Sequence, residues 1–351
     1  MGRCQNRASP YWPGVARRAA HPAAPMQPSR HSLITGTLFA LAAGLMWGLV
    51  FIAPTLLAEY PPALLVVGRY LAFGLIALPL GWFARQALRE LSRADWTEAL
   101  KLSAVGNLLY YLCLAAAIQM AGGPLPTMII GTLPVVIAIT ANLRNQARDG
   151  RLPWSRLAAP LLLIAAGIAC VNHAEWQALQ ASGSGDLGRY LTGGLLALGA
   201  VVCWTWYPLR NADWLRAHPD RSPSAWATAQ GLATLPPALA GFLLFWLWGV
   251  LQGSTFPVPL GPTPVFFVGL MLAVGVLASW LGTLCWNESS QRLPTSLAGQ
   301  LIVFETLAAL AYAFALRGQW PGPVTLLGIG LLVAGVLLGV RQRPQPVAVP
   351  A

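Results

Sequence analysis

Two ionisable side chains lie deep inside long apolar segments, where a charge is costly and usually has a partner. Glu305 lies about 16 Å into the apolar segment at residues 294–316, close to its middle. A carboxylate at that depth can bind a cationic group or a proton, or accept a hydrogen bond from a neighbouring helix. Arg69 lies about 10 Å inside the segment at residues 62–84. It can bind a carboxylate, form a fixed ion pair, or extend its charge to the membrane boundary.

Polar and aromatic residues in three further segments could contact a solute. Asn107, Tyr110 and Tyr111 follow the i, i+3, i+4 spacing of one helix face, and their groups suit an amphipathic molecule. Trp47 and Trp204 lie near the middle of their segments rather than at the lipid–water boundary. All five could equally be packing residues. With the two ionisable residues they form the candidate substrate-binding set.

The cysteines and histidines indicate neither catalysis nor metal binding. The five cysteines include no close pair, and four of them lie within apolar segments, where a thiol behaves as a small hydrophobe. The four histidines lie outside the segment centres, and the sequence contains no phosphate-binding loop, dinucleotide fingerprint or nucleophile elbow. We therefore expect no catalytic residue, no metal site and no cofactor.

The composition of the chain indicates which kind of element carries these residues. Hydrophobic residues make up 56% of the 351 positions and charged residues 9%, against about 25% charged in soluble domains. This composition predicts an all-α integral membrane protein whose main partner, besides a small molecule, is membrane lipid. The net charge is +11, but the basic residues lie in the short gaps between apolar segments and form no concentrated patch. We expect no nucleic-acid partner.

Ten segments are long and apolar enough to cross a bilayer. They lie at residues 34–57, 62–84, 99–120, 124–142, 155–173, 189–209, 224–249, 264–287, 294–316 and 322–340. If these ten alternate in direction, nineteen of the 22 Lys and Arg residues fall on the side of the N-terminus and only Arg189 and Arg317 on the other. Basic residues prefer cytoplasmic loops. We therefore predict ten transmembrane helices with both termini in the cytoplasm.

The two ends of the chain differ from this pattern. Residues 1–32 are rich in Pro, Ala and Arg and contain no apolar run, which predicts a disordered cytoplasmic leader rather than a signal peptide. Residues 341–351 are predicted to form a cytoplasmic tail.

The chain contains an internal repeat. The sequence from Thr35 to Trp47 matches that from Thr192 to Trp204 at seven of thirteen positions, and the tripeptide AVG occurs in both the third and the eighth segments. The repeat predicts two five-helix halves, at residues 33–173 and 189–340. Because five is odd, the second half must be inverted in the membrane, as in many secondary transporters.

These residues resemble those of the drug/metabolite transporter superfamily, EamA type, over about residues 33–340. The resemblance rests on the Gly36 to Trp47 and Gly193 to Trp204 stretches, on Arg69, on LCWNESSQRLP at residues 284–294, and on the glutamate of the ninth segment. Family members often have Glu-Pro in that segment and Gly-Glu after it. Here Glu305-Thr306 and Arg317-Gly318 stand in those places.

The resemblance implies export or exchange of small organic solutes, with amino acids, related metabolites and drugs as the expected classes. We expect a secondary transporter of the bacterial inner (plasma) membrane that works by alternating access. Two alternatives are a lipid or isoprenoid carrier and a membrane-embedded transferase. The transferase would require a cluster of acid–base groups at one membrane face, which the sequence lacks. The oligomeric state is not indicated.

Overall fold

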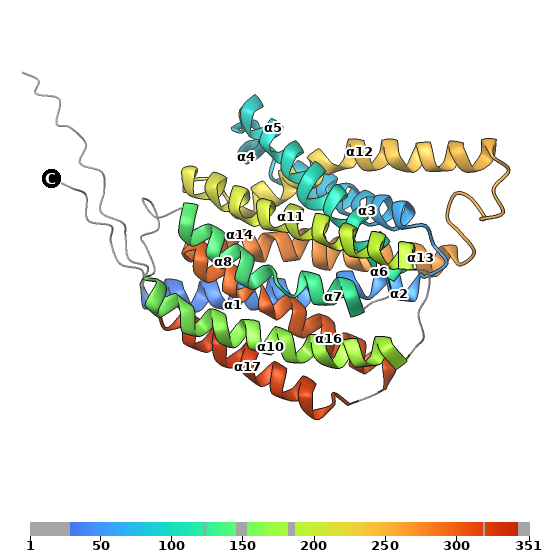
Figure 1. Ribbon diagram of the computed structural model, residues 1–351. Coiled ribbons are helices and arrows are strands. Elements are labelled where there is room, and N and C mark those ends of the chain that lie inside the picture. Colours follow the sequence, from blue (N-terminus) through green and yellow to red (C-terminus); the bar gives the residue numbers. More distant parts are fainter. Residues whose placement is uncertain (1–28, 122–123, 145–152, 182–186, 319, 343–351) are drawn as a thin grey trace, which may run out of the picture.

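The computed structural model describes residues 29–121, 124–144, 153–181, 187–318 and 320–342, and within these residues every regular element is a helix. The helices run roughly along one common axis (Figure 1). Within the described residues, seven helices are long and apolar enough to cross a membrane. Three shorter apolar helices accompany them, at Leu133–Arg144, Trp154–Cys170 and Pro323–Gly339. The structure therefore confirms an all-helical membrane protein, with helices at all ten of the segments found in the sequence.

The elements fall into two halves. The first half contains α1 (Arg30–Gly48), η1 (Leu49–Phe51), α2 (Ala53–Leu56), α3 (Pro62–Phe83), α4 (Arg85–Arg89), α5 (Arg93–Leu102), η2 (Ser103–Leu109), α6 (Tyr110–Ala121), α7 (Pro124–Ile130), α8 (Leu133–Arg144) and α10 (Trp154–Ala181). The second half contains α11 (Leu187–Ala217), α12 (Pro223–Leu251), α13 (Pro264–Val274), η3 (Gly275–Leu281), α14 (Gly282–Arg292), α15 (Thr295–Leu301), α16 (Val303–Arg317) and α17 (Pro323–Val340).

The boundaries differ from the predicted ones mainly by extension. Helix α10 continues to Ala181 and α11 to Ala217, several residues past the apolar segments that predicted them. Polar residues at the ends of these helices prolong them beyond the hydrocarbon layer, so a hydropathy boundary is not a helix boundary. Most of the predicted leader and tail lies outside the described residues. Helix α1 begins at Arg30, capped by the Ser29 side chain, which accepts a hydrogen bond from Ser32 N.

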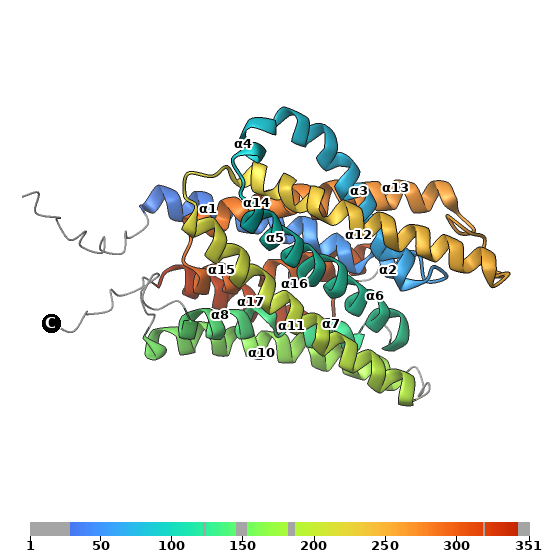
Figure 2. The same cartoon turned by 90° about the horizontal axis from the view of Figure 1, so that it is seen from above.

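Equivalent spans of the two halves make equivalent packing contacts. Helices α3 and α12 pack together, as do α8 and α15, and α10 and α17. Each of these pairs joins equivalent spans of the two halves. Helix α1 packs on α14 of the eighth span, just as its equivalent, α11, packs on α6 of the third span. In the same way α1 contacts the ninth span through α16, and α11 contacts the fourth span through α7. When whole spans are compared, exchanging the halves leaves this pattern unchanged, as expected for two structural repeats. Figure 2 shows the same helices from above.

Helix interruptions also occur in matched places. The third span contains the π-helix η2 and the eighth contains the π-helix η3. The fourth span is broken between α7 and α8, and the ninth between α15 and α16. Such interruptions free backbone groups and are tolerated at membrane depth where protein surrounds them. The segment bounds predicted from hydropathy do not mark these interruptions.

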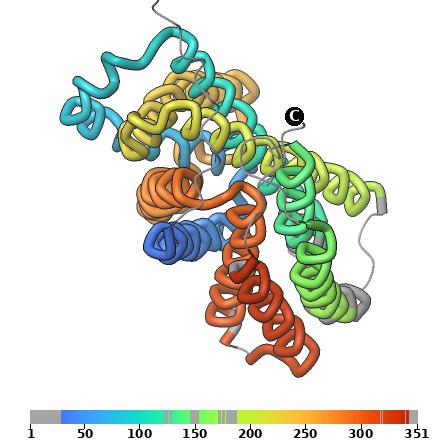
Figure 3. The backbone as a smooth tube through the Cα atoms, turned by 90° about the vertical axis from the view of Figure 1, so that its left-hand side faces the viewer, coloured from blue at the N-terminus to red at the C-terminus, as the bar shows by residue number. Residues whose placement is uncertain are grey.

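Close helix contacts bring the halves together beside α1. A Cβ atom on Gly44 would lie 2.9 Å from Phe304 Cβ, and one on Gly48 would lie 2.7 Å from Ala308 Cβ. Small residues therefore allow α1 to pack directly on α16. Seen along the helices, α1 also lies beside α14 (Figure 3). Together these contacts position the first turn of α16 at the junction of the two halves.

Candidate functional site

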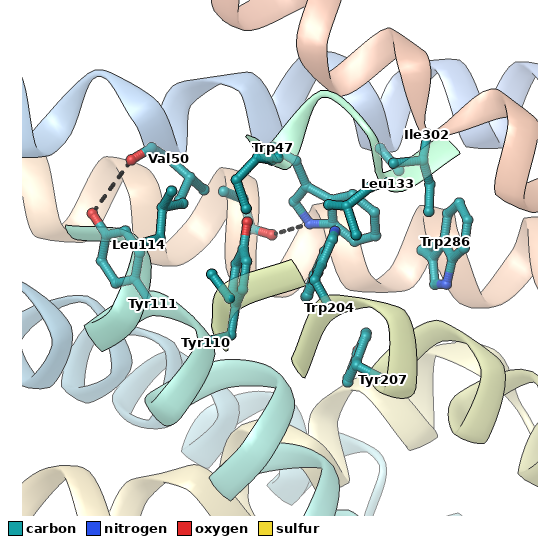
Figure 4. Close-up of a cluster of buried hydrophobic side chains, with 14 of the residues drawn as sticks. Trp47, Val50, Tyr110, Tyr111, Leu114, Leu133, Trp204, Tyr207, Trp286 and Ile302 are labelled. Carbon is teal, nitrogen blue, oxygen red and sulfur yellow. Dashed lines mark hydrogen bonds between the residues drawn. The ribbon is translucent and has the colours of Figure 1, made fainter. Parts of the chain in front are cut away.

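Five aromatic side chains from four helices meet at the junction of the halves (Figure 4). They are Trp47 of α1, Tyr110 of α6, Trp204 and Tyr207 of α11, and Trp286 of α14. The Trp204 ring stacks on Tyr110, with centroids 4.4 Å apart, and on Tyr207, with centroids 5.1 Å apart. Trp47 meets Trp204 edge-on at 5.0 Å and lies 5.3 Å from Trp286. We call these five residues the aromatic cluster.

Glu305 borders the aromatic cluster from the first turn of α16, directly after the break in the ninth span. Its side chain accepts a hydrogen bond from Trp204 Nε1 at 3.3 Å, and the residue is only 2% exposed. The N-terminal end of a helix favours negative charge. Among the described residues, no ion pair reaches this carboxylate. A buried carboxylate without a counter-ion suits a cationic ligand or a proton.

Arg69 occupies a second polar position, on α3. Its Nε donates to Ser279 Oγ of η3 at 2.9 Å, and its guanidinium lies 4.6 Å from the Tyr111 ring centroid and 4.9 Å from that of Tyr70. The residue is 4% exposed, so it does not extend to the membrane boundary. Within the described part of the chain it has no ion pair, and its Nη1 is buried without a hydrogen-bond partner. The site can therefore accept an anionic group.

The predicted face of Asn107, Tyr110 and Tyr111 contacts three different neighbours. Asn107 Nδ2 lies 3.5 Å from Thr234 Oγ1 of α12, whereas Tyr110 stacks on α11. Tyr111 lies beside Arg69, and its hydroxyl lies 3.5 Å from the Val50 carbonyl oxygen (Figure 4). The physical reason is η2, whose wider turns rotate Asn107 away from the positions that α-helical spacing predicts.

Six of the seven predicted residues thus lie in two adjoining groups. Trp47, Tyr110, Trp204 and Glu305 form one group, and Arg69 and Tyr111 form the other. Tyr110 of the first group and Tyr111 of the second are adjacent in α6, so the two groups adjoin there. Asn107 lies to one side, against α12. Their roles in binding a solute stay predictions.

Sequence reasoning missed four residues of this region. Tyr207 lies three positions after Trp204, so the same helical spacing that was applied to the third span would have found it. Trp286 lies within the LCWNESSQRLP stretch that carries the family resemblance. Tyr70 directly follows Arg69 in the chain, so its neighbourhood could have been read from the sequence. Ser279 has no sequence signal, because only the packing of η3 on α3 brings it to Arg69.

A chain of buried polar side chains leads away from the aromatic cluster. The Tyr207 hydroxyl donates to Gln230 Oε1 at 2.9 Å, and Gln230 Nε2 donates to Asn211 Oδ1 at 3.1 Å. Asn211 Nδ2 then donates to Asn287 Oδ1 at 2.7 Å, and Asn287 Nδ2 to the Pro223 carbonyl at 3.2 Å. All four side chains are at most 1% exposed. These bonds join α11, α12 and α14 between the cluster and one end of the bundle.

Comparisons with known proteins agree with this architecture. The model of the EamA-like transporter family matches residues 34–172. The chain is 55% identical to the inner membrane protein YtfF of Escherichia coli K12 over 313 residues, covering 89% of this chain and 97% of that protein. It is 31% identical to the threonine/homoserine exporter RhtA of E. coli K12 over 162 residues, covering 44% and 48%. A crystal structure with 20% sequence identity has the same fold, with a TM-score of 0.65 over 88% of this chain and 96% of that one.

The fold and these matches define a helical membrane transporter. The chain belongs to the EamA-like transporter family, within the drug/metabolite transporter superfamily.

Proposed function

We propose that this protein is a secondary transporter that exports a small organic solute with a protonated amine across the bacterial inner membrane. Amino acids, related metabolites and amine drugs are the candidate solutes. Family membership supports transport rather than catalysis, and a relative that is 55% identical is named an inner membrane protein. A more distant relative, which matches about half of the chain, is named a threonine/homoserine exporter.

The observation that carries the proposal is the environment of Glu305. The carboxylate is buried at the junction of the two halves, borders an aromatic cluster, and has no ion pair within the described residues. Aromatic rings and a carboxylate both attract organic cations, and their attraction is stronger away from water. A protonated amine entering this region would neutralise the charge of Glu305.

Arg69 supports a second contact for the same solute. Its Nη1 is a buried donor without a partner among the described residues, on a guanidinium that lies beside the rings of Tyr70 and Tyr111. A solute with both an amine and a carboxylate would satisfy Glu305 and Arg69 together. We therefore place amino acids and their relatives ahead of simple amines as the proposed solutes.

Alternating access is supported by the exchangeable packing of the halves and by their matched helix interruptions. Two inverted halves with equivalent contacts can adopt inward-open and outward-open arrangements of similar energy. The candidate residues are at most 7% exposed in this structure, so neither face of the membrane reaches them here. Together with the charge pattern, which predicts cytoplasmic termini, this gives a cycle of loading from the cytoplasm, closure and release outside.

A transport experiment tests the role of Glu305. Overexpression should protect cells against one or more toxic amino acids, analogues or cationic drugs in a growth screen. Glu305→Gln keeps the size of the side chain but removes its charge, so it should abolish protection while the protein stays in the membrane. Glu288→Gln is the matched control, because Glu288 lies at the end of α14 and pairs with Arg292. Full protection by Glu305→Gln would refute the proposal.

A further inference from the structure

The two repeat-related tryptophans differ in what their indole N–H groups bind. Trp47 Nε1 donates to the Ala278 carbonyl oxygen of η3 at 2.9 Å, a typical length for a hydrogen bond to the main chain. Trp204 Nε1 instead donates to Glu305 Oε2, at 3.3 Å. Equivalent residues of the two halves therefore perform different tasks. Trp47 binds a permanently available backbone acceptor, whereas Trp204 binds the carboxylate that we propose receives the solute.

The Trp204 ring is held in place by its faces rather than by its hydrogen bond. Tyr110 stacks on it with an interplanar angle of 17°, and Tyr207 stacks on it with an angle of 1°. The Trp47 ring packs against the Trp204 ring in an edge-on arrangement, with centroids 5.0 Å apart. The ring thus keeps its position whether or not its N–H group has a partner. The bond to Glu305 can break and form again without repacking the aromatic cluster.

The Glu305 carboxylate is weakly solvated in this arrangement. An ionised carboxylate has about four acceptor sites. A neutral indole donor at 3.3 Å occupies one of them at the long end of the hydrogen-bond range, and the other polar side chain that faces it is the neutral hydroxyl of Tyr110. Hydrogen bonds from charged donors are shorter and about twice as strong. An ammonium group that binds Glu305 through Oε2 would therefore displace the indole N–H, and the N–H competes with it for that oxygen.

We propose that Trp204 sets the affinity of the site by acting as an internal competitor for Glu305. In the unloaded protein its N–H group occupies the carboxylate position that the cationic group of the solute takes on binding. This inference rests on the proposed function, because it requires that Glu305 bind the cation. The hydrogen bond from Trp204 gives the Glu305 carboxylate a partner while the site is empty. Because this bond must break when the solute binds, it lowers the affinity for the solute.

Removing only the N–H group tests the proposal. Trp204→Phe keeps a flat ring between Tyr110 and Tyr207 but has no donor. Benzylammonium serves as the probe, titrated by calorimetry into the purified full-length protein. We expect Trp204→Phe to bind it about tenfold more tightly than the wild type, because the competing bond is absent. Damage to the structure would weaken binding, so a gain in affinity distinguishes competition from a purely structural role.

Trp280→Phe is the matched control. Trp280 Nε1 also donates at 3.3 Å, but its acceptor is the neutral Thr228 hydroxyl of α12 and not Glu305. This variant should bind benzylammonium as the wild type does. The double variant Trp204→Phe with Glu305→Gln should lose the gain entirely. If Trp204→Phe does not fold, 3-benzothienylalanine at position 204 keeps the shape of indole, replaces N–H by sulfur, and should give the same gain.

Trp204→Phe protein that binds benzylammonium no more tightly than the wild type, or not at all, would overturn the inference. An equal gain in Trp280→Phe, or a gain that survives Glu305→Gln, would overturn it as well. Failure of the proposed function has a different signature, since Glu305→Gln would then still protect cells. If the growth screen supports Glu305 but Trp204→Phe shows no gain, only the competitor role is lost.

Discussion

The two ends of the helix bundle hold the halves together by different chemistry. At the end where α1 begins, which we call the charged end, three contacts between the halves are ion pairs between arginine and an acidic residue. Glu98 of α5 binds Arg210 of α11 through two bonds of 2.5 and 3.1 Å, and Arg144 of α8 lies 3.1 Å from Asp213. Glu90 pairs with Arg221 at the same end. Each pair joins a residue of the first half to one of the second.

The opposite end is joined mainly by aromatic packing, and we call it the aromatic end. Tyr60 stacks on Phe267 with centroids 5.0 Å apart and meets Phe256 edge-on at 5.5 Å. Its hydroxyl lies 3.0 Å from Thr263 Oγ1. Arg189 contributes a hydrogen bond to the Gln119 carbonyl oxygen at 3.0 Å. Aromatic packing is insensitive to salt, whereas ion pairs are directional and partly screened.

The difference teaches that one set of charges serves two purposes. The arginines that predict a cytoplasmic location for the charged end also bind the acidic residues of the other half. The positive charge of the loops and the ion pairs between the halves therefore come from the same side chains. Opening the charged end requires separating these ion pairs, whereas opening the aromatic end requires exposing rings.

The comparison is first tested by topology, where the expected effect is all or none. A reporter fused after residue 217 should be cytoplasmic, and one fused after residue 255 should be periplasmic, because nineteen of 22 basic residues favour that orientation. Measurement uses paired alkaline phosphatase and fluorescent protein fusions. Opposite signals at both positions would place the charged end outside and reverse the direction of the proposed cycle.

Truncating the ring at the aromatic end should give the largest loss of stability. Tyr60 is 1% exposed, so Tyr60→Ala removes two ring contacts and leaves a cavity. We expect a loss of about 3 kcal/mol in the free energy of unfolding, measured by thermal and denaturant unfolding in detergent.

Tyr60→Phe is the control for this prediction. It keeps the rings and loses only the hydroxyl contact with Thr263, so it should cost about 1 kcal/mol. Equal losses in the two variants would mean that the hydrogen bond, not the stacking, holds this end.

Breaking the ion pair between Glu98 and Arg210 at the charged end should have a smaller effect. Glu98 is 10% exposed and Arg210 45% exposed by side chain, so the pair is only partly shielded from solvent. Glu98→Gln should lower the free energy of unfolding by about 1–2 kcal/mol. The exchanged pair, Glu98→Arg with Arg210→Glu, should recover part of that loss. No recovery would show that Glu98 acts through packing and not through charge.

The smallest effect is expected at the exposed edge of the charged end. Glu90 is 64% exposed by side chain, and water screens its pair with Arg221. Glu90→Gln should change the free energy of unfolding by less than about 0.5 kcal/mol. Added salt should remove even that difference, while leaving the Tyr60→Ala effect unchanged. A loss as large as that of Glu98→Gln would mean that this pair is shielded from solvent.

Much of this architecture could be predicted from the sequence. Ten apolar segments, few charges and the repeat ending in Trp47 and Trp204 predict an inverted helical transporter, and the structure has helices at all ten segments. The sequence also singled out Glu305 and Arg69, because an ionisable residue is rare at membrane depth. These inferences depend on transfer from water to an apolar medium, which each segment's own composition determines.

The contacts within the site were decided by tertiary packing. Hydropathy cannot distinguish a helix face in lipid from one against protein, because both surroundings are apolar. The sequence therefore could not show that Trp204 rather than Trp47 would bind Glu305, or that Arg69 would bind Ser279. It also could not place the interruptions that rotate Asn107 towards α12. At Gly106, a Cβ would lie 2.2 Å from Tyr207 Cδ2. The course of η2 thus depends on a neighbouring helix about a hundred residues away along the chain, and local sequence carries no record of that neighbour.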